Sequence, residues 1–280
     1  MLLVTYSVDG GPRRVGSLRD NEIVETTAES MTDVIHNGLI ETGVRHALGA
    51  VTLHAPLRPG KIVGIGLNYT EHVAESARTL DTDKELPQRP VLFSKPATAV
   101  VGPDEPIQHN GNLTQQLDWE CELAVVIGRT ARRVRPEDAL SHVFGYSIMN
   151  DISARDQRRS GQWFFSKGQD SYAPFGPAIL VAGDLAADEP ADPHDLDLSL
   201  RVNGEVKQKS NTRYMLFRIP DLIADISSGM TLEPGDVIST GSPAGVGASF
   251  TPQQFLRPGD VVEAAIERIG TLRNPVVDAR

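Results

Sequence analysis

An apolar segment that carries two carboxylates limits the possible folds of this chain more than any other feature. Leu123 to Ile127 is an unbroken apolar run, which is typical of a strand buried on both faces. Glu120 and Glu122 lie at its start, and because side chains alternate along a strand, both project from one face with their Cα atoms about 7 Å apart. A third carboxylate, Asp151, ends another apolar stretch. The fold must therefore accommodate three acidic groups beside a core.

These acidic groups have two interpretations. Unpaired carboxylates beside a core lose hydration and repel each other, and a divalent cation removes both costs. Because the set contains no His or Cys, it suits a hard cation such as Mg²⁺ or Mn²⁺. Alternatively, Glu120 and Glu122 pair with Arg or Lys on a half-exposed strand. The spacing alone does not separate these interpretations.

Composition and charge exclude several classes of protein. The formal net charge is −10 over 280 residues, which argues against nucleic acid as a partner because nucleic-acid binding requires a basic surface. No apolar run approaches the ~20 residues of a membrane span, so we expect no membrane contact. The start of the chain lacks the pattern of a signal peptide, and the single cysteine, Cys121, excludes an internal disulfide. We expect a cytoplasmic protein in which Cys121 is a small buried apolar residue.

Apolar periodicity predicts an α+β, β-rich fold in two parts. Residues 1–55 form a predicted small, β-rich N-terminal domain, and residues 56–280 form a larger domain that begins at the Pro/Gly-rich segment 56–60. In the small domain, Leu2 to Val8 alternates as a strand does, and Ser30–Gly43 is a predicted helix with Ser30 as its N-cap.

Short apolar runs between Gly/Pro turns predict the strands of the larger domain. They are Ile62–Ile65, Val91–Phe93, Leu123–Ile127, Phe144–Met149, Ala178–Val181, Leu196–Val202, Val237–Thr240 and Val261–Ile266. The predicted helices are Tyr69–Ala77, Pro136–His142 and Ile219–Ser228. The segment Ser76–Arg89 is polar and weakly patterned, and we expect it to be a mobile surface loop of the kind that forms a lid.

Several short motifs follow one another in the larger domain. They are Gly66-Leu67-Asn68-Tyr69 with His72 and Glu75, Phe93-Ser94-Lys95-Pro96, Glu120-Cys121-Glu122, Asn150 to Asp156, Lys167-Gly168, Pro174 to Pro177, Asn203-Gly204, Pro234 to Gly247 and Gly259-Asp260. Through these motifs the chain resembles the fumarylacetoacetate hydrolase superfamily, in particular acylpyruvate hydrolases. The resemblance implies a mixed β-sandwich or roll for the catalytic domain and a structural role for the N-terminal domain. It does not specify the substrate, because the family includes hydrolases, decarboxylases, isomerases and dehydratases.

The resemblance also implies a role for individual residues. Glu120, Glu122 and Asp151 would hold one Mg²⁺ or Mn²⁺ ion per chain. The catalytic residues would be His72, Glu75 and Lys167, with His72 and Glu75 on a lid helix where they activate water and Lys167 stabilising a developing enolate. The substrate-binding residues would be Tyr69, Arg155, Gln157, Thr240, Gly241 and Ser242.

Two positions depart from the pattern of the family. Ser242 stands in the Thr240-Gly241-Ser242-Pro243 loop where threonine is usual, and the hydroxyl group is retained. After Arg155 and Asp156, many relatives have one residue and then a glutamine that contacts substrate, whereas this chain has Gln157 followed directly by Arg158. Either Gln157 serves from a shifted position, Arg158 replaces the contact and favours a second substrate carboxylate, or the segment is a solvated basic turn.

The leading functional expectation is a metal-dependent hydrolase that cleaves a C–C bond in a small anionic 2-oxo acid. The substrate would be a β-diketo acid of the acylpyruvate or fumarylpyruvate type, as in aromatic catabolism, and the products would be pyruvate and a carboxylic acid. The alternatives are an oxaloacetate decarboxylase, a 2-hydroxy-diene-dioate isomerase and a 2-keto-3-deoxy sugar acid dehydratase, which share the metal and enolate chemistry. A non-catalytic metal-binding protein belongs to a different class. Relatives are usually homodimers, and we expect the same here.

Overall fold

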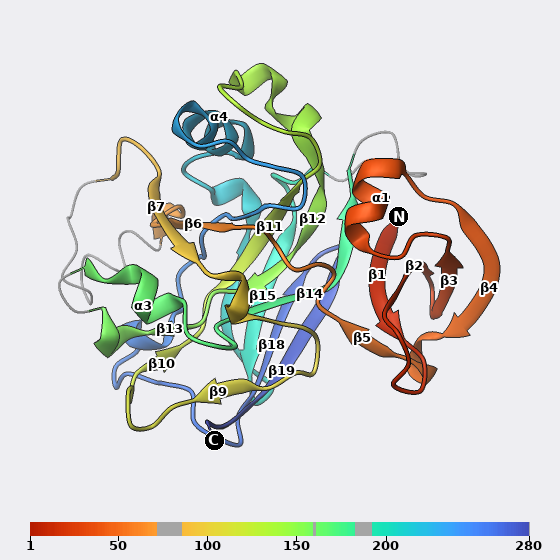
Figure 1. Ribbon diagram of the computed structural model, residues 1–280. Helices are drawn as coiled ribbons and strands as arrows, with labels where there is room; N and C mark the ends of the chain where they lie inside the picture. Colours follow the sequence, from red (N-terminus) through yellow and green to blue (C-terminus); the bar gives the residue numbers. More distant parts are fainter. Residues whose placement is uncertain (72–85, 159–160, 183–191, 280) are drawn as a thin grey trace.

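The computed structural model describes residues 1–71, 86–158, 161–182 and 192–279. It has the predicted α+β architecture, rich in strands and poor in helices (Figure 1). One large mixed sheet of 12 strands runs through the molecule in the order β4-β3-β2-β1-β14-β12-β11-β17-β6-β7, with β5 beside β1 and β8 beside β14. A sheet of five strands (β16-β15-β18-β19-β9) and a short pair (β10-β13) complete it.

The first 54 residues form a compact antiparallel part on the right of Figure 1. Its strands are β1 (Leu2–Ser7), β2 (Arg14–Arg19), β3 (Glu22–Thr26), β4 (Glu41–Ala47) and β5 (Thr52–His54). Strand β1 pairs with β14, so this part continues the large sheet. The predicted domain boundary at residues 55–56 stays a prediction.

The helix predicted in this part is shorter than expected. Helix α1 spans Met31–Asn37, and the Ser30 side chain caps it by accepting a hydrogen bond from the Asp33 N–H at 3.2 Å, as predicted. The prediction that the helix continues to Gly43 is wrong. Gly38 adopts φ 81°, a left-handed conformation that favours glycine and ends the helix, and β4 begins three residues later.

The strands of the larger part include every strand predicted there. They are β6 (Ile62–Gly66), β7 (Val91–Lys95), β8 (Val100–Val101), β9 (Ile107–His109), β10 (Leu117–Asp118), β11 (Cys121–Ile127), β12 (Val143–Asn150), β13 (Ser153–Ala154), β14 (Ala173–Val181), β15 (Asp197–Val202), β16 (Glu205–Asn211), β17 (Val237–Ser239), β18 (Val261–Ile266) and β19 (Gly270–Asp278). Strand β11 lies between β12 and β17 and is buried along its length. Its odd-numbered side chains, including Leu123 and Val125, enter the main core, whereas Ala124 and Val126 enter a second core on the other face. The apolar run therefore has the two-faced burial that its sequence predicts.

The helices are few and short. Helix α4 (Ile219–Gly229) confirms its prediction, and it buries Ile219, Leu222, Ile223 and Ile226, the spacing of one helix face. Pro136–His142 forms a 3-10 helix, η3, which packs against α4. Helix α3 spans Trp163–Lys167, and the other 3-10 turns are η1 (Leu48–Ala50), η2 (Ala97–Ala99), η4 (Arg155–Gln157), η7 (Thr212–Tyr214) and η8 (Gly247–Ser249).

Two predictions fall on residues outside the described ranges. Thr70 and Glu71 are helical, but the remainder of the helix predicted over Tyr69–Ala77 lies beyond what the structure describes, as does most of the predicted lid Ser76–Arg89. Among the described residues, no helix combines the length and apolar character needed to cross a bilayer.

Candidate active site

The register of the central strands brings the three predicted carboxylates together. Cys121 of β11 lies opposite Asn150 of β12, so Asp151 follows directly beside Glu120 and Glu122. The Asp151 N–H donates to the carbonyl of Glu120 at 2.8 Å. One oxygen from each of the three side chains lies within 4.8 Å of the other two, and all three residues are buried. The cluster therefore has the compactness that one shared cation requires.

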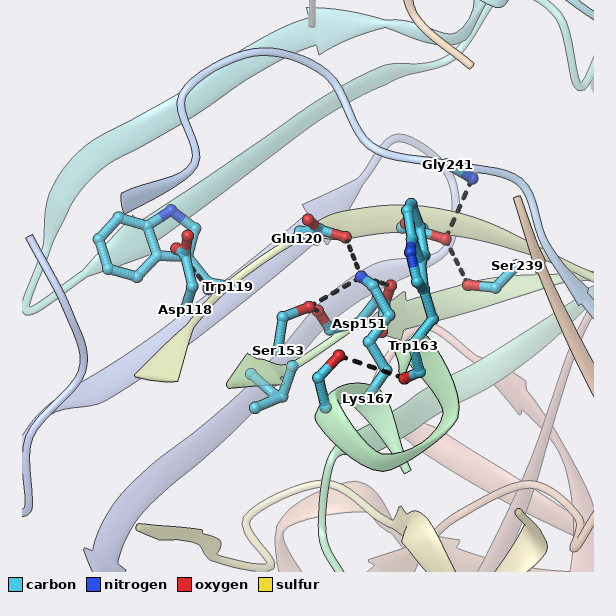
Figure 2. Close-up of polar contacts among 12 residues, drawn as sticks. Asp118, Trp119, Glu120, Asp151, Ser153, Trp163, Lys167, Ser239 and Gly241 are labelled. Carbon is cyan, nitrogen blue, oxygen red and sulfur yellow. Dashed lines mark hydrogen bonds and ion pairs between the residues drawn. The ribbon is translucent and has the colours of Figure 1, made fainter. Parts of the chain in front are cut away.

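Glu122 is held by hydrogen-bond donors from the neighbouring strand β17 and the loop after it. Its Oε2 accepts from Ser239 Oγ at 2.6 Å and from the Gly241 N–H at 3.0 Å (Figure 2). Burial raises the pKa of Glu122 well above its usual value, and the nearby charges of Asp151 and Glu120 raise it further. The two donors and the charge of Lys167 favour the ionised form, whereas none of the described cations forms a salt bridge with Glu122.

Lys167, at the end of α3, supplies one of two ammonium groups to the cluster. Its Nζ donates to Glu120 Oε2 and Ser153 Oγ, each at 2.8 Å, and also contacts Asp151 (Figure 2). Burial lowers the pKa of Lys167, but Asp151 and Glu120 outweigh it, so the pKa is raised above its ordinary value. Lys167 is thus a fixed positive charge.

Lys95, the last residue of β7, supplies the second ammonium group. It is buried, contacts the other carboxylate oxygen of Asp151, and donates to the carbonyl of Ile152 at 3.1 Å. Burial lowers its pKa, although the charge of Asp151 opposes this. Asp151 is therefore held between two lysines, one on each oxygen.

Arg155 follows β13 and is oriented by Asp118. The β10–β13 pairing places Asp118 opposite Ser153, and Asp118 Oδ2 accepts from Arg155 Nε at 2.8 Å. Arg155 Nη2 lies 2.6 Å from Glu120 Oε1. Asp118 is fully buried and also accepts hydrogen bonds from the backbone N–H groups of Gly247 (2.6 Å) and Ala248 (3.0 Å). One carboxylate therefore ties the arginine to the glycine-rich loop.

The loop after β17 is held against β6 by a buried asparagine. Asn68 donates to the carbonyls of Thr240 (2.7 Å) and Phe217 (3.1 Å). Gly241 adopts φ 95°, and a Cβ atom there would lie 2.7 Å from the Asn68 Cβ, so only glycine fits. The Ser242 hydroxyl that follows is buried, and within the described part of the chain it has no hydrogen-bond partner.

These groups surround one pocket with about 520 Å³ of empty space, part of which is open to solvent. The carboxylates Glu120 and Glu122, the cations Arg155, Arg158 and Lys167, and the hydroxyl of Ser242 line it together with an apolar wall. That wall consists of Ile65, Gly66, Leu67, Phe93, Ala154 and Trp163. A small anion with an apolar middle would match such a lining.

The donor set fits a divalent cation. Among the described residues, the three carboxylates contact the ammonium groups of Lys95 and Lys167, and Glu120 also contacts Arg155, which Asp118 shares. All the donors are hard oxygen atoms, which suits Mg²⁺ or Mn²⁺. Glu120 does pair with Lys167 and Arg155, as the alternative interpretation held, but the strand is buried and Glu122 has no salt bridge among the described residues.

The predicted substrate-binding residues are distributed unevenly around the pocket. Arg155 and Ser242 line it, whereas Gly241 donates to Glu122 and Thr240 donates its hydroxyl proton to the carbonyl of Leu123 at 2.9 Å. The Tyr69 hydroxyl is buried without a described partner, and burial raises its pKa well above 10.

Of the two candidates after Asp156, only one reaches the pocket. The Gln157 side chain is buried and donates to the Leu113 carbonyl, whereas Arg158 lines the pocket. The predicted catalytic residues His72 and Glu75 lie outside the described residues, so their role stays a prediction.

Sequence reasoning missed three contributors to the site. Lys95 stood in a recognised motif without a role, and its signal was a lysine at the end of an apolar strand. Trp163 forms part of the pocket wall and Ser239 binds Glu122, and neither residue type carries a signal of its own.

Comparison with known proteins identifies a matching family and similar proteins. The family model "Fumarylacetoacetate (FAA) hydrolase C-terminal" matches residues 61–277. The chain is 43% identical over 234 residues to oxaloacetate tautomerase YisK of Bacillus subtilis (strain 168), which covers 82% of this chain and 75% of that protein.

Solved structures share the whole fold. A 5-carboxymethyl-2-hydroxymuconate delta-isomerase from Mycobacterium smegmatis is 37% identical with a TM-score of 0.83, and all of each chain is covered. Maleylpyruvate hydrolase from Sphingobium sp. SYK-6, solved with manganese(II) and pyruvate, is 30% identical with a TM-score of 0.79 and the same coverage. These similar proteins thus include a tautomerase, an isomerase and a hydrolase.

Proposed function

The chain belongs to the fumarylacetoacetate hydrolase family, and from this we propose that it is a metal-dependent enzyme that tautomerises oxaloacetate or a close dicarboxylic 2-oxo acid. The observation that carries the proposal is the buried cluster of Glu120, Glu122 and Asp151, whose two glutamates line a pocket together with Lys167 and Ser242. The similarity to an oxaloacetate tautomerase over most of the chain supports the choice of reaction.

The reaction moves one proton between the 2-oxo oxygen and the adjacent carbon. Glu120, Glu122 and Asp151 would hold Mg²⁺ or Mn²⁺, which supplies a Lewis acid for the 2-oxo group. Lys167 places a permanent positive charge at the floor of the pocket, where negative charge develops on the substrate oxygen. In the metal-free cluster the neighbouring carboxylates raise the pKa of Lys167, and its proposed role is to act by charge.

The remaining pocket groups bind and orient the substrate. Ser242 offers a hydroxyl donor for a carboxylate, with no hydrogen-bond partner among the described residues, and Arg155 is oriented by its hydrogen bond to Asp118. The apolar wall of Phe93 and Trp163 excludes water from the reacting carbon. Among the described residues that line the pocket there is no His or Cys. We propose that His72 and Glu75, which the sequence predicts to activate water, carry the proton to and from carbon in this reaction.

A second candidate is the C–C bond hydrolysis expected from the sequence. The likeness to maleylpyruvate hydrolase over the full chain favours it. This reaction needs the same site plus a water molecule activated by His72, and its products would be pyruvate and a carboxylic acid.

Parallel assays distinguish the two reactions. Enol-oxaloacetate ketonisation is followed by its ultraviolet absorbance, and acylpyruvate or maleylpyruvate cleavage by pyruvate release, with Mn²⁺-loaded protein and a protein-free Mn²⁺ control. We expect kcat/KM to be at least about tenfold higher for ketonisation. A higher value for cleavage would reverse the order of the two candidates. His72→Ala should then slow that cleavage by about 10² to 10⁴, the range of a general base.

A further inference from the structure

One arginine at the pocket lacks a carboxylate partner. Arg155 contacts both Asp118 and Glu120, so its charge is matched. Arg158, three residues later, also lines the pocket, but over the described ranges it forms no salt bridge. Its guanidinium carbon lies 4.0 Å from the centre of the Trp163 ring. Among the described residues, the pocket therefore contains one arginine without a salt-bridge partner, on which Glu120 acts only through its charge.

The surroundings of Arg158 make this charge costly. The side chain is half-buried, and burial together with the positive charge of Arg155 lowers its pKa from the ordinary value of arginine, although the charge of Glu120 opposes this. A partly desolvated cation without an anionic partner destabilises the empty site. An anionic ligand group beside it would recover that free energy.

Trp163 holds the guanidinium in a fixed place. The Trp163 ring packs on Phe93, with ring centres 5.5 Å apart, and lies so close to Gly66 that a Cβ atom there would be 2.9 Å from it. Stacking uses the flat face of the guanidinium and leaves the N–H donors at its edge for a carboxylate, which they bind in bidentate fashion. Because stacking already restricts the side chain, the loss of side-chain entropy on ligand binding should be smaller than for an arginine without such a contact.

The pocket thus offers two separate anchors for anions. Ser242 lies in the loop after β17, and the carboxylate cluster lies where β11 begins and β12 ends. Arg158 directly follows η4, and Trp163 is the first residue of α3. Gln157, the other candidate in this segment, is committed to the Leu113 carbonyl.

We propose that Arg158 determines substrate specificity by binding the second carboxylate of a dicarboxylic 2-oxo acid, distal to the 2-oxo group, while stacked on Trp163. This inference rests on the proposed function for the place of the 2-oxo acid in the pocket. It assigns Arg158 to substrate binding and not to the proton transfer.

Oxaloacetate and pyruvate test the inference, because pyruvate lacks only the distal carboxylate. Dissociation constants of both are measured by calorimetry on Mn²⁺-loaded wild type, Arg158→Gln and Arg158→Lys. Arg132→Gln, which removes an exposed arginine away from the pocket, is the matched control. We expect Arg158→Gln to weaken the binding of oxaloacetate about 10- to 100-fold, the range of a charge-assisted pair. The binding of pyruvate should weaken less than about threefold. Arg158→Lys keeps the charge but loses the bidentate edge, so its dissociation constant for oxaloacetate should lie between those of wild type and Arg158→Gln. Arg132→Gln should change neither dissociation constant.

The ratio of the two constants separates the possible outcomes. If Arg158 had a merely structural role, Arg158→Gln would weaken the binding of both ligands and leave the ratio of their dissociation constants unchanged. That result would overturn the proposal. A wild type that does not bind oxaloacetate more tightly than pyruvate would also overturn it. The dissociation constants do not require the protein to be catalytically active. A protein that shows the ratio change but no ketonisation would therefore refute the proposed function and leave the assignment of Arg158 standing.

Discussion

Substitution of Asp118 by asparagine tests how the site is held together. Asp118 is fully buried and accepts hydrogen bonds from Arg155 Nε and from three backbone N–H groups, those of Trp119, Gly247 and Ala248. Asparagine has nearly the same volume, so the packing is preserved. Its amide NH₂, however, would face either the arginine or a backbone donor, and two donors cannot satisfy each other.

The expected loss follows from these contacts. Removal of one partner of a buried ion pair costs about 3–5 kcal/mol, and each buried donor left unsatisfied costs about 1–3 kcal/mol. Because these terms describe the same groups, they do not add, and we expect the free energy of unfolding to fall by about 3–5 kcal/mol. Since Arg155 loses its orientation, kcat/KM should also fall by at least about tenfold.

Urea unfolding at a fixed protein concentration measures this loss. Asp104→Asn is the control, because Asp104 pairs with Arg273 at the surface, where its side chain is 73% exposed, and a surface pair contributes at most about 1 kcal/mol. If Asp118→Asn were as stable as Asp104→Asn, with unchanged kcat/KM, the positioning role of Asp118 would be refuted.

Three further predictions concern metal binding, the cysteine and assembly. In the metal-free protein the folded-state pKa of Glu122 is raised above its unfolded value, so ionisation of Glu122 destabilises the fold as pH rises. The increase in Tm on adding Mn²⁺ should therefore be larger at about pH 8 than at about pH 6. An equal or smaller increase at about pH 8 would contradict this. Burial raises the pKa of Cys121, so a thiol reagent should label it only in urea, and rapid labelling of the native protein would show that β11 opens. Light scattering at micromolar concentration should give about twice the mass of one 30.3 kDa chain, and an active monomer would refute the predicted homodimer.

The part of the site that could be predicted follows from strand alternation. Glu120 and Glu122 share one face of the segment, and Cys121 lies on the other. This follows from the alternation of side chains along a strand once Leu123–Ile127 is taken as a buried strand. Their convergence with Asp151 depends on the β11–β12 register, which single-residue patterns do not encode and which only the resemblance supplied.

Other parts of the structure carried weak or misleading signals. Strand β16, Glu205–Asn211, lies at the edge of its sheet next to β15 and is mostly polar, so it lacks the apolar pattern of a strand. Strand β19 contains Pro275, which is unusual within a strand. Neither strand was predicted. The helix over Ser30–Gly43 was extended too far because the left-handed turn at Gly38 outweighs the apolar residues beyond it. Lys95 was overlooked because its partner, Asp151, is 56 residues away in the sequence.

Metal-dependent ketonisation of enol-oxaloacetate tests the central claim most directly. The rate is measured for wild type treated with EDTA, for the same protein after Mn²⁺ is restored, and for Glu122→Gln with Mn²⁺, with the rate of free Mn²⁺ alone subtracted. Glutamine retains the size of Glu122 and removes one of the three ligand charges. We predict that EDTA abolishes the protein-dependent rate, that Mn²⁺ restores it, and that Glu122→Gln lowers it by at least about 10², the scale of lost Lewis-acid stabilisation. A metal-free protein that ketonises the substrate at the full rate would contradict the account.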